Sequence, residues 1–158
     1  MTVWTSPESL TALLGTTIGR PVKATPASKR EPRNSDFVAV YAHDRRARAA
    51  FVCDLTLAAC ASAALQVFPP DRAKENIATG DLEEDLRENL HEIFNICTQV
   101  INAVSPRHVS LAHVCQFHEA PPWLKECVTT SETKMNVEVE IQGYGRGRIG
   151  LALFGNDW

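Results

Sequence analysis

The sequence lacks any long apolar run, and no stretch approaches the roughly 20 residues that a membrane-spanning helix requires. It also lacks an excess of basic residues: the net charge is −3 and both signs are interspersed, which favours neither nucleic acid nor an anionic membrane as a partner. The first residues, MTVWTSPESL, hold no basic segment followed by an apolar block, so we expect no secretion signal. These absences predict a cytoplasmic protein.

The number of cysteines is odd, which argues against a disulfide framework. The five cysteines are scattered along the chain, at positions 53, 60, 97, 115 and 127. We expect reduced thiols, most of them small core residues. With 158 residues, 44% hydrophobic and 22% charged, the chain has the size and composition of a single globular domain over residues 1–158.

Two segments have the pattern of β-hairpins, residues 36–53 and residues 136–154. Alternation of apolar and polar residues over 137–142 is typical of a half-buried strand, and the glycine-rich tip at 143–145 suits a tight turn. The two segments lie 100 positions apart and align without a gap, which indicates an internal repeat.

The rest of the chain reads as helices and one further strand. We expect a first helix from residue 6 that ends near Gly15 or Gly19, and further helices over 54–67 and 80–104. We also expect a strand over 108–117, a short helix from residue 121, and an exposed loop over 25–35. This order predicts an α+β fold rather than a strict β-α-β alternation.

The long helix over residues 80–104 has a buried stripe and an opposite polar stripe. Leucine, isoleucine, cysteine and valine recur at steps of three and four and fall within about 80° of one another on a helical wheel. On the far side, an arc of about 60° holds the four residues Glu88, Glu92, Asn95 and Gln99. Such a stripe is the ordinary solvent face of a helix, but asparagine is a mediocre helix former, so Asn95 needs an explanation.

The run Glu92-Ile93-Phe94-Asn95, placed on a long helix after a hairpin and a second helix, resembles the E-x-x-N motif of the CheC/CheX/FliY phosphatases of bacterial chemotaxis. The layout of residues 6–154 is similar to that family. The resemblance implies a CheC-like fold, in which a duplicated helix-plus-strands unit forms one continuous sheet with two long helices packed on it. A single motif resembles the CheX type.

The resemblance also implies a function. The family hydrolyses the phospho-aspartate of the response regulator CheY, so it implies a CheY-like receiver domain as partner and a homodimer as the assembly. Asn95 would orient the attacking water, Glu92 would pair with a lysine of the receiver, and Glu88 and Gln99 would contact the partner. No cofactor of the protein's own is implied, because the receiver would supply Mg²⁺.

The sequence departs from the family pattern at Glu88, Gln99 and Ile101, where smaller residues are usual. Displacement of the docked partner by about 1 Å can cost on the order of 100-fold in rate. The alternative hypothesis is therefore a non-catalytic CheX-like module that binds a response regulator or another signalling partner. A third hypothesis is dimerisation through an open sheet edge at Val137–Ile141.

Four residues of the types that bind zinc lie in the C-terminal half of the chain: His113, Cys115, His118 and Cys127. Their spacing fits no standard zinc finger or ribbon, so we expect ordinary structural residues and no metal. The arginines at the two hairpin tips could form a partner surface, although solvated loop charge is the usual reason for them.

Overall fold

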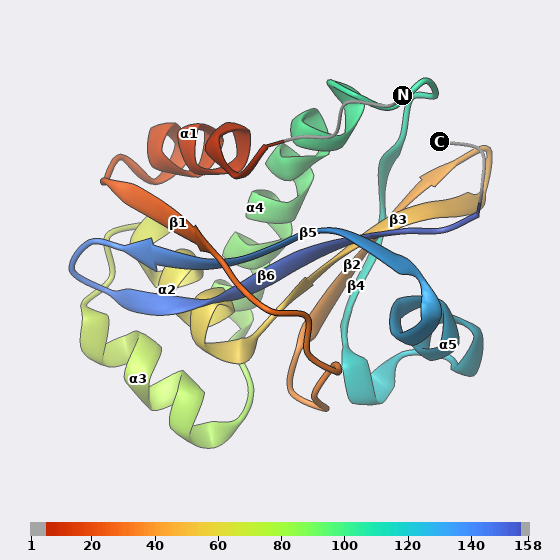
Figure 1. The fold of residues 1–158 in the computed structure, drawn as a ribbon. Helices are drawn as coiled ribbons and strands as arrows, with labels where there is room; N and C mark the ends of the chain where they lie inside the picture. The colour runs from red at the N-terminus through yellow and green to blue at the C-terminus, as the bar shows by residue number, and fades with distance from the viewer. Residues whose placement is uncertain (1–5, 156–158) are drawn as a thin grey trace.

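One antiparallel sheet organises the part of the chain that the computed structural model describes, residues 6–155 (Figure 1). Its six strands are β1 (Val22–Pro26), β2 (Phe37–His43), β3 (Arg46–Cys53), β4 (Ser110–Gln116), β5 (Glu132–Ile141) and β6 (Gly145–Leu153). The helices described are α1 (Pro7–Ile18), α2 (Leu55–Leu65), α3 (Pro70–Thr79), α4 (Glu84–Asn102) and α5 (Pro122–Thr130), with a 3₁₀ turn at Phe117–Glu119. The α+β fold and both hairpins are confirmed.

The strand order is β1-β5-β6-β3-β2-β4, and exchanging each strand of the first half for its counterpart in the second gives the same order read from the opposite edge. At the centre, β3 pairs with β6 so that Phe51 lies opposite Leu151, its own equivalent at an offset of 100 positions. The backbone repeats this symmetry, because the Asp54 amide donates to the Arg148 carbonyl (2.9 Å) and the Phe154 amide donates to the Arg48 carbonyl (2.8 Å). The predicted duplication is therefore built into the pairing at the centre of the sheet.

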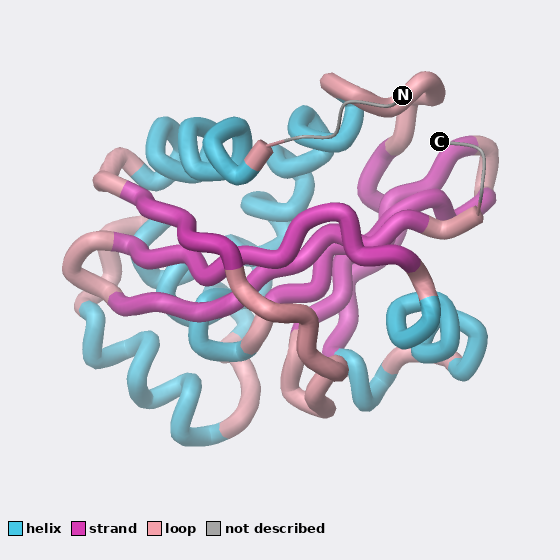
Figure 2. Tube along the Cα trace, viewed as in Figure 1, coloured by secondary structure: helices cyan, strands magenta, loops and turns pink. Residues whose placement is uncertain are grey.

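The two faces of the sheet carry different helices. Helices α1, α2 and α4 pack on one face, and α5 lies apart from them on the other, as Figure 2 shows. Strand residues alternate between the two sides, so Tyr41 and Phe51 join the larger core under α4, whereas Val38 and Ala152 join a smaller cluster under α5. This alternation leaves α4 with one buried face and one free face.

The sequence predicts no helix between residues 67 and 80, where two consecutive prolines, Pro69 and Pro70, indicate a helix stop, but α3 occupies this stretch. Proline ends a helix when it follows one, but it also suits the first helical position, where its missing N–H has no partner to lose. Pro70 takes that position in α3, and Gly80 ends the helix in a left-handed conformation (φ 83°). The long helix therefore begins at Glu84 rather than at residue 80.

The expectation of an open sheet edge at Val137–Ile141 is wrong. β5 lies between β6 and the short strand β1, whose Val22 pairs with Ile141 and whose Pro26 pairs with Val137. Within residues 6–155 the edges of the sheet are β1 and β4. Dimerisation through β5 is thereby excluded, because both of its sides are already paired.

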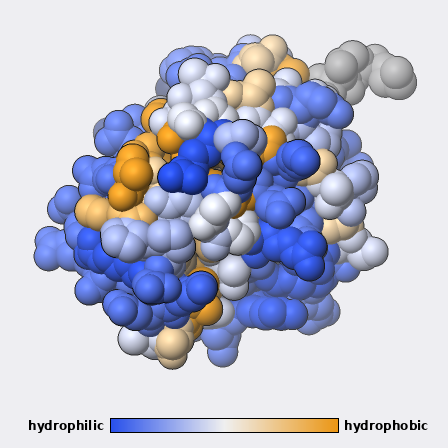
Figure 3. Space-filling view, turned by 90° about the vertical axis from the view of Figure 1, so that its left-hand side faces the viewer, coloured by the Kyte–Doolittle hydropathy of each residue, from blue (hydrophilic) through white to orange (hydrophobic). Residues whose placement is uncertain are grey.

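The side of the molecule at the left of Figure 1 is mostly hydrophilic, and Figure 3 shows only small, separate hydrophobic areas on it. Among the described residues, no helix combines the length and the apolar character needed to cross a bilayer.

Candidate functional site

The N-terminus of α4 is anchored by α3. The Glu83 amide donates to the Asn76 side chain (2.6 Å), which in turn donates to the Glu83 carboxylate (3.0 Å). Arg72 bonds to Glu83 (3.1 Å) and also to Asp85 in the first turn of the helix. These hydrogen bonds hold the pKa values of both carboxyls below their ordinary values, Glu83 chiefly through Asn76 and Asp85 chiefly through Arg72. Acidic groups in the first turn also suit the positive end of the helix dipole.

The predicted buried stripe of α4 is confirmed and faces the sheet. It consists of Leu86, Leu90, Ile93, Phe94, Cys97, Val100 and Ile101. Within it, the Tyr41 hydroxyl of β2 donates a hydrogen bond of 2.6 Å to the backbone carbonyl of Phe94. Five residues earlier, the side chain of Asn89 donates to the Ser62 carbonyl (2.9 Å) and to Gln66 (3.1 Å), which fixes α4 against α2.

The polar stripe lies in solvent on the opposite side of α4. All four predicted site residues, Glu88, Glu92, Asn95 and Gln99, are exposed. The side chains of these four residues make no hydrogen bond or ion pair with any residue between 6 and 155. Because Glu92 and Asn95 are one turn apart on a helix held at Phe94 and Asn89, they form a pair on a firm support, open to a docking molecule.

Sequence reasoning missed His91, which is exposed on the same face one turn before Asn95. With Arg87 and Glu88 it borders a hollow of about 310 Å³ between α4 and the sheet, where Phe37 and Val114 contribute apolar surface. The helical spacing of His91 to Glu88 and Asn95 was a signal available from the sequence. The hollow could not be predicted from the sequence, because it depends on how α4 lies over β2 and β4.

The departure at Ile101 acts differently from what was expected. Its side chain is fully buried in the main core, so it cannot touch a molecule that docks on the outer face of α4. Of the three departures from the family pattern, Glu88 and Gln99 alone lie on the exposed face.

The candidate metal residues do not converge. The His118 ring is hydrogen-bonded to Gln116 (3.0 Å), and Cys115 is buried in the cluster under α5. Over residues 6–155, no three histidine, cysteine or acidic side chains are grouped so that they could hold a metal ion. All five cysteines are free thiols and four are buried; burial raises the pKa of Cys60 to about 11 and that of Cys97 to about 12.

Comparison with known proteins identifies the fold. No family model matches the chain, and the search of curated proteins finds no match either. Three solved structures are similar over most of both chains. FliM of H. pylori, in its complex with SpeE, has a TM-score of 0.61 and 10% identity, and the match covers 92% of this chain and 80% of that one. FliY of Thermotoga maritima has a TM-score of 0.53 and 15% identity over 94% of this chain and 83% of that one, and a chain of the CheX–CheY–BeF3–Mg complex of Borrelia burgdorferi has a TM-score of 0.51 and 12% identity over 94% of each chain. The chain therefore has the CheC/CheX/FliY-like fold that the E-x-x-N motif indicated.

Proposed function

We propose that this protein is a CheX-like phosphatase that hydrolyses the phospho-aspartate of a response-regulator receiver domain. The observation that carries the proposal is the exposed Asn95 carboxamide, one turn from the exposed Glu92 carboxylate on the firmly held α4. The fold supports it, because one structure with this fold is of a complex that contains CheY and Mg²⁺.

An acyl phosphate is already activated, so the catalyst needs only to position the attacking water and to stabilise the phosphoryl group during transfer. A water oxygen attacks phosphorus, the bond between phosphorus and the aspartyl oxygen breaks, and inorganic phosphate and a free carboxylate result. Asn95 would accept from the water through its C=O and donate to the phosphoryl group through its NH₂, which a carboxylate cannot do. Glu92 would pair with the lysine of the receiver, and the receiver would supply its own Mg²⁺.

The test mixes the protein with receiver domains loaded by acetyl phosphate in the presence of Mg²⁺, and follows the release of phosphate. We expect a CheY-like receiver to lose its phosphoryl group faster with wild-type protein than alone. Removing one group that acts on the transition state costs about 10²–10³ in rate, so Asn95→Ala should abolish most of the acceleration.

A matched control is Asn34→Ala, which removes an exposed carboxamide from the loop between β1 and β2, outside the polar stripe of α4, and should leave the acceleration unchanged. Equal loss in both variants, or no acceleration with any receiver from the same organism, would contradict the proposal.

The second candidate is a non-catalytic module that binds a receiver or another signalling partner. Long side chains at Glu88 and Gln99, and the hollow beside Glu88, favour it, because they enlarge the docking surface beyond what positioning a water requires. A receiver complex that survives Asn95→Ala, is lost with Glu92→Lys, and shows no acceleration of phosphate release would support this candidate over the first.

The homodimer expected from the family resemblance is also a proposal. Sedimentation velocity checks it directly, and with β5 internal, the strand edges open to a second copy within residues 6–155 are β1 and β4.

A further inference from the structure

A groove of about 320 Å³ lies on the face of the sheet opposite α4. It is bounded by α5, by residues 29–32 of the loop between β1 and β2, and by β5 and β6. This volume is within the range of pockets that bind small molecules. The groove shares no residue with the polar stripe of α4, so it is independent of the function proposed above.

The floor of the groove is apolar. Val52, Ala152 and Val128 line it, the first two from the central strands and the third from α5. Gly150 is also part of the floor, where a Cβ atom would come within 3.2 Å of the Met135 carbonyl oxygen. An apolar floor of this kind suits the hydrocarbon or aromatic part of a ligand.

One wall of the groove holds a salt bridge that is already complete. Arg30 bonds to both carboxylate oxygens of Asp36 (3.0 Å each), and the Arg33 amide donates to the same carboxylate (2.9 Å). Asp36 is almost fully buried, so its charge is fully committed to these donors. It therefore cannot also neutralise the other cations of the groove.

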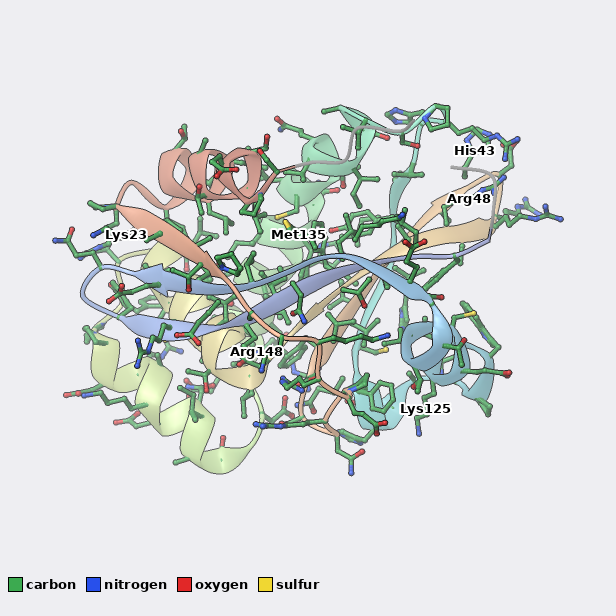
Figure 4. The ribbon with its side chains drawn as sticks, in the orientation of Figure 1. Lys23, His43, Arg48, Lys125, Met135 and Arg148 are labelled. Carbon is green, nitrogen blue, oxygen red and sulfur yellow. The ribbon has the colours of Figure 1, made fainter. Side chains whose placement is uncertain are left out.

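Arg148 is the cation that remains. Its side chain rises from β6 beside the loop between β1 and β2, as Figure 4 shows, and one of its terminal nitrogens donates to the Ser28 carbonyl. Its Nε is buried and has no hydrogen-bond acceptor, and no carboxylate within residues 6–155 forms an ion pair with it. A buried, charged donor without an acceptor is costly, and an anion is the partner that would remove the cost.

Two further polar side chains line the groove at different distances from Arg148: Asn136 pairs with Gly150, two residues after Arg148 on β6, whereas Thr133 pairs with Ala152. The side chains of Thr133 and Asn136 line the groove, and neither is hydrogen-bonded to another described residue. Lys29 contributes a second cation at the exposed rim, and no carboxylate among residues 6–155 pairs with it. Arg148 and Asn136 therefore lie close together, and Lys29 follows Ser28, the residue to which Arg148 donates.

We propose that this groove binds a small organic anion, with its phosphate or carboxylate group on Arg148 and Asn136 and its apolar part on Val52, Val128 and Ala152. The site is amphipathic, and its charge is concentrated at one end. Inorganic phosphate would contact only the polar end of the groove, and a neutral aromatic molecule would contact only its apolar floor.

The test is a titration of ¹⁵N-labelled full-length protein, followed by NMR, with phenyl phosphate, benzoate, inorganic phosphate and phenol in separate series. We expect saturable shifts of groove amides with phenyl phosphate or benzoate, and weaker binding of inorganic phosphate and phenol. Arg148→Gln should weaken binding by about 10-fold or more, since hydrogen bonds to charged groups are among the stronger ones. Arg146→Gln is the matched control, because Arg146 lies on the same strand but is exposed and pairs with Glu138, and it should leave binding unchanged.

Arg148→Gln also removes the bond to Ser28, so a second variant separates binding from folding. Asn136→Asp keeps the size of the side chain, leaves Arg148 in place, and puts a negative charge where the ligand's anion would lie. It should weaken binding by a similar factor. The proposal is overturned if neither phenyl phosphate nor benzoate gives saturable shifts in the groove, if Arg146→Gln weakens binding as much as Arg148→Gln, or if Asn136→Asp binds as tightly as wild type.

Discussion

The Tyr41 hydroxyl reaches across the core to the carbonyl of Phe94, the residue immediately before Asn95, at 2.6 Å. Tyr41 is fully buried, so Tyr41→Phe would leave the donor position empty without changing the packing of the ring. We expect the free energy of unfolding to fall by about 1 kcal/mol, the usual net worth of such a bond, and α4 to be less firmly held beside Asn95. Urea denaturation measures the first effect, and the receiver phosphatase assay measures the second.

Tyr144→Phe is the control for that experiment. The Tyr144 hydroxyl also donates to a backbone carbonyl at 2.6 Å, that of Phe68, but it joins the tip between β5 and β6 to the end of α2. Both variants should lose similar stability. A loss of acceleration in Tyr144→Phe as large as that in Tyr41→Phe would show that the bond at Phe94 has no special bearing on Asn95.

Gly147 lies where a side chain would be crowded by the first turn of α2. A Cβ atom at this position would lie 2.6 Å from the Leu57 amide nitrogen and 2.7 Å from the Leu57 Cβ, where the first turn of α2 approaches β6. Neither group can move easily, because Asp54 caps this turn by accepting from the Leu57 amide (2.8 Å) and from the Arg148 amide (2.9 Å). Gly147→Ala should therefore destabilise the protein by about 1–3 kcal/mol.

Gly15→Ala provides the comparison for Gly147→Ala in thermal or urea unfolding. Gly15 lies inside α1, and its added Cβ would meet nothing closer than the Arg20 carbonyl at 3.5 Å. Alanine is the better helix former, so this variant should gain up to about 1 kcal/mol. If the free energy of unfolding of Gly147→Ala is as high as that of Gly15→Ala, α2 does not approach β6 as closely as described.

The sequence predicted those helices and strands whose apolar pattern is visible within the element itself. The alternation in β5 and the three-four spacing in α4 each follow from burial of one face, so both could be seen without knowing the neighbours. The offset of 100 positions between the hairpins was also visible, and the pairing of Phe51 with Leu151 follows it.

Features that depend on distant pairing could not be predicted in this way. β1 is five residues long, ends in proline and has an irregular burial pattern, so nothing local indicated that it covers β5. Arg148 and Ser28 are 120 positions apart and meet only because the loop after β1 crosses the sheet. The same holds for His91, whose neighbouring hollow requires α4, β2 and β4 together.

Acid should weaken the anchor at the start of α4. Hydrogen bonds from Asn76 and Arg72 lower the pKa of Glu83 from 4.5, and those from Arg72 lower the pKa of Asp85 from 3.8. The unfolded chain therefore binds protons first as the pH falls, so the stabilisation is fully present above these ordinary values and is lost as the pH falls through the lower folded values.

Unfolding of wild type and Arg72→Gln by urea across pH 3–7, a range about the ordinary carboxyl values, measures that loss. The difference between the two proteins should be largest at neutral pH and should shrink as the pH falls. Lys74→Gln is the control on the same helix, because the ion pair of Lys74 with Asp71 is long (3.9 Å) and both side chains are exposed, so it should contribute little to stability. A difference between wild type and Arg72→Gln that stays constant down to pH 3 would show that these ion pairs add nothing to stability.

Val67 is a branched residue in a left-handed conformation (φ 58°), and its side chain is 68% exposed. It ends α2 in the position where glycine is usual: the Val67 amide donates to the Ala64 carbonyl (3.1 Å) and the Phe68 amide to the Ala63 carbonyl (2.9 Å), the pair of bonds that closes a Schellman motif. Valine there is strained and gains little from packing, since most of it is in solvent. Val67→Gly should therefore raise the free energy of unfolding by about 1 kcal/mol, and Val67→Ala, which keeps a Cβ but loses the branch, should raise it by less. Thermal unfolding of the three proteins checks this order. If glycine destabilises the chain instead, the entropy that glycine adds to the unfolded state outweighs the strain, and the left-handed conformation at this position is not a burden to the fold.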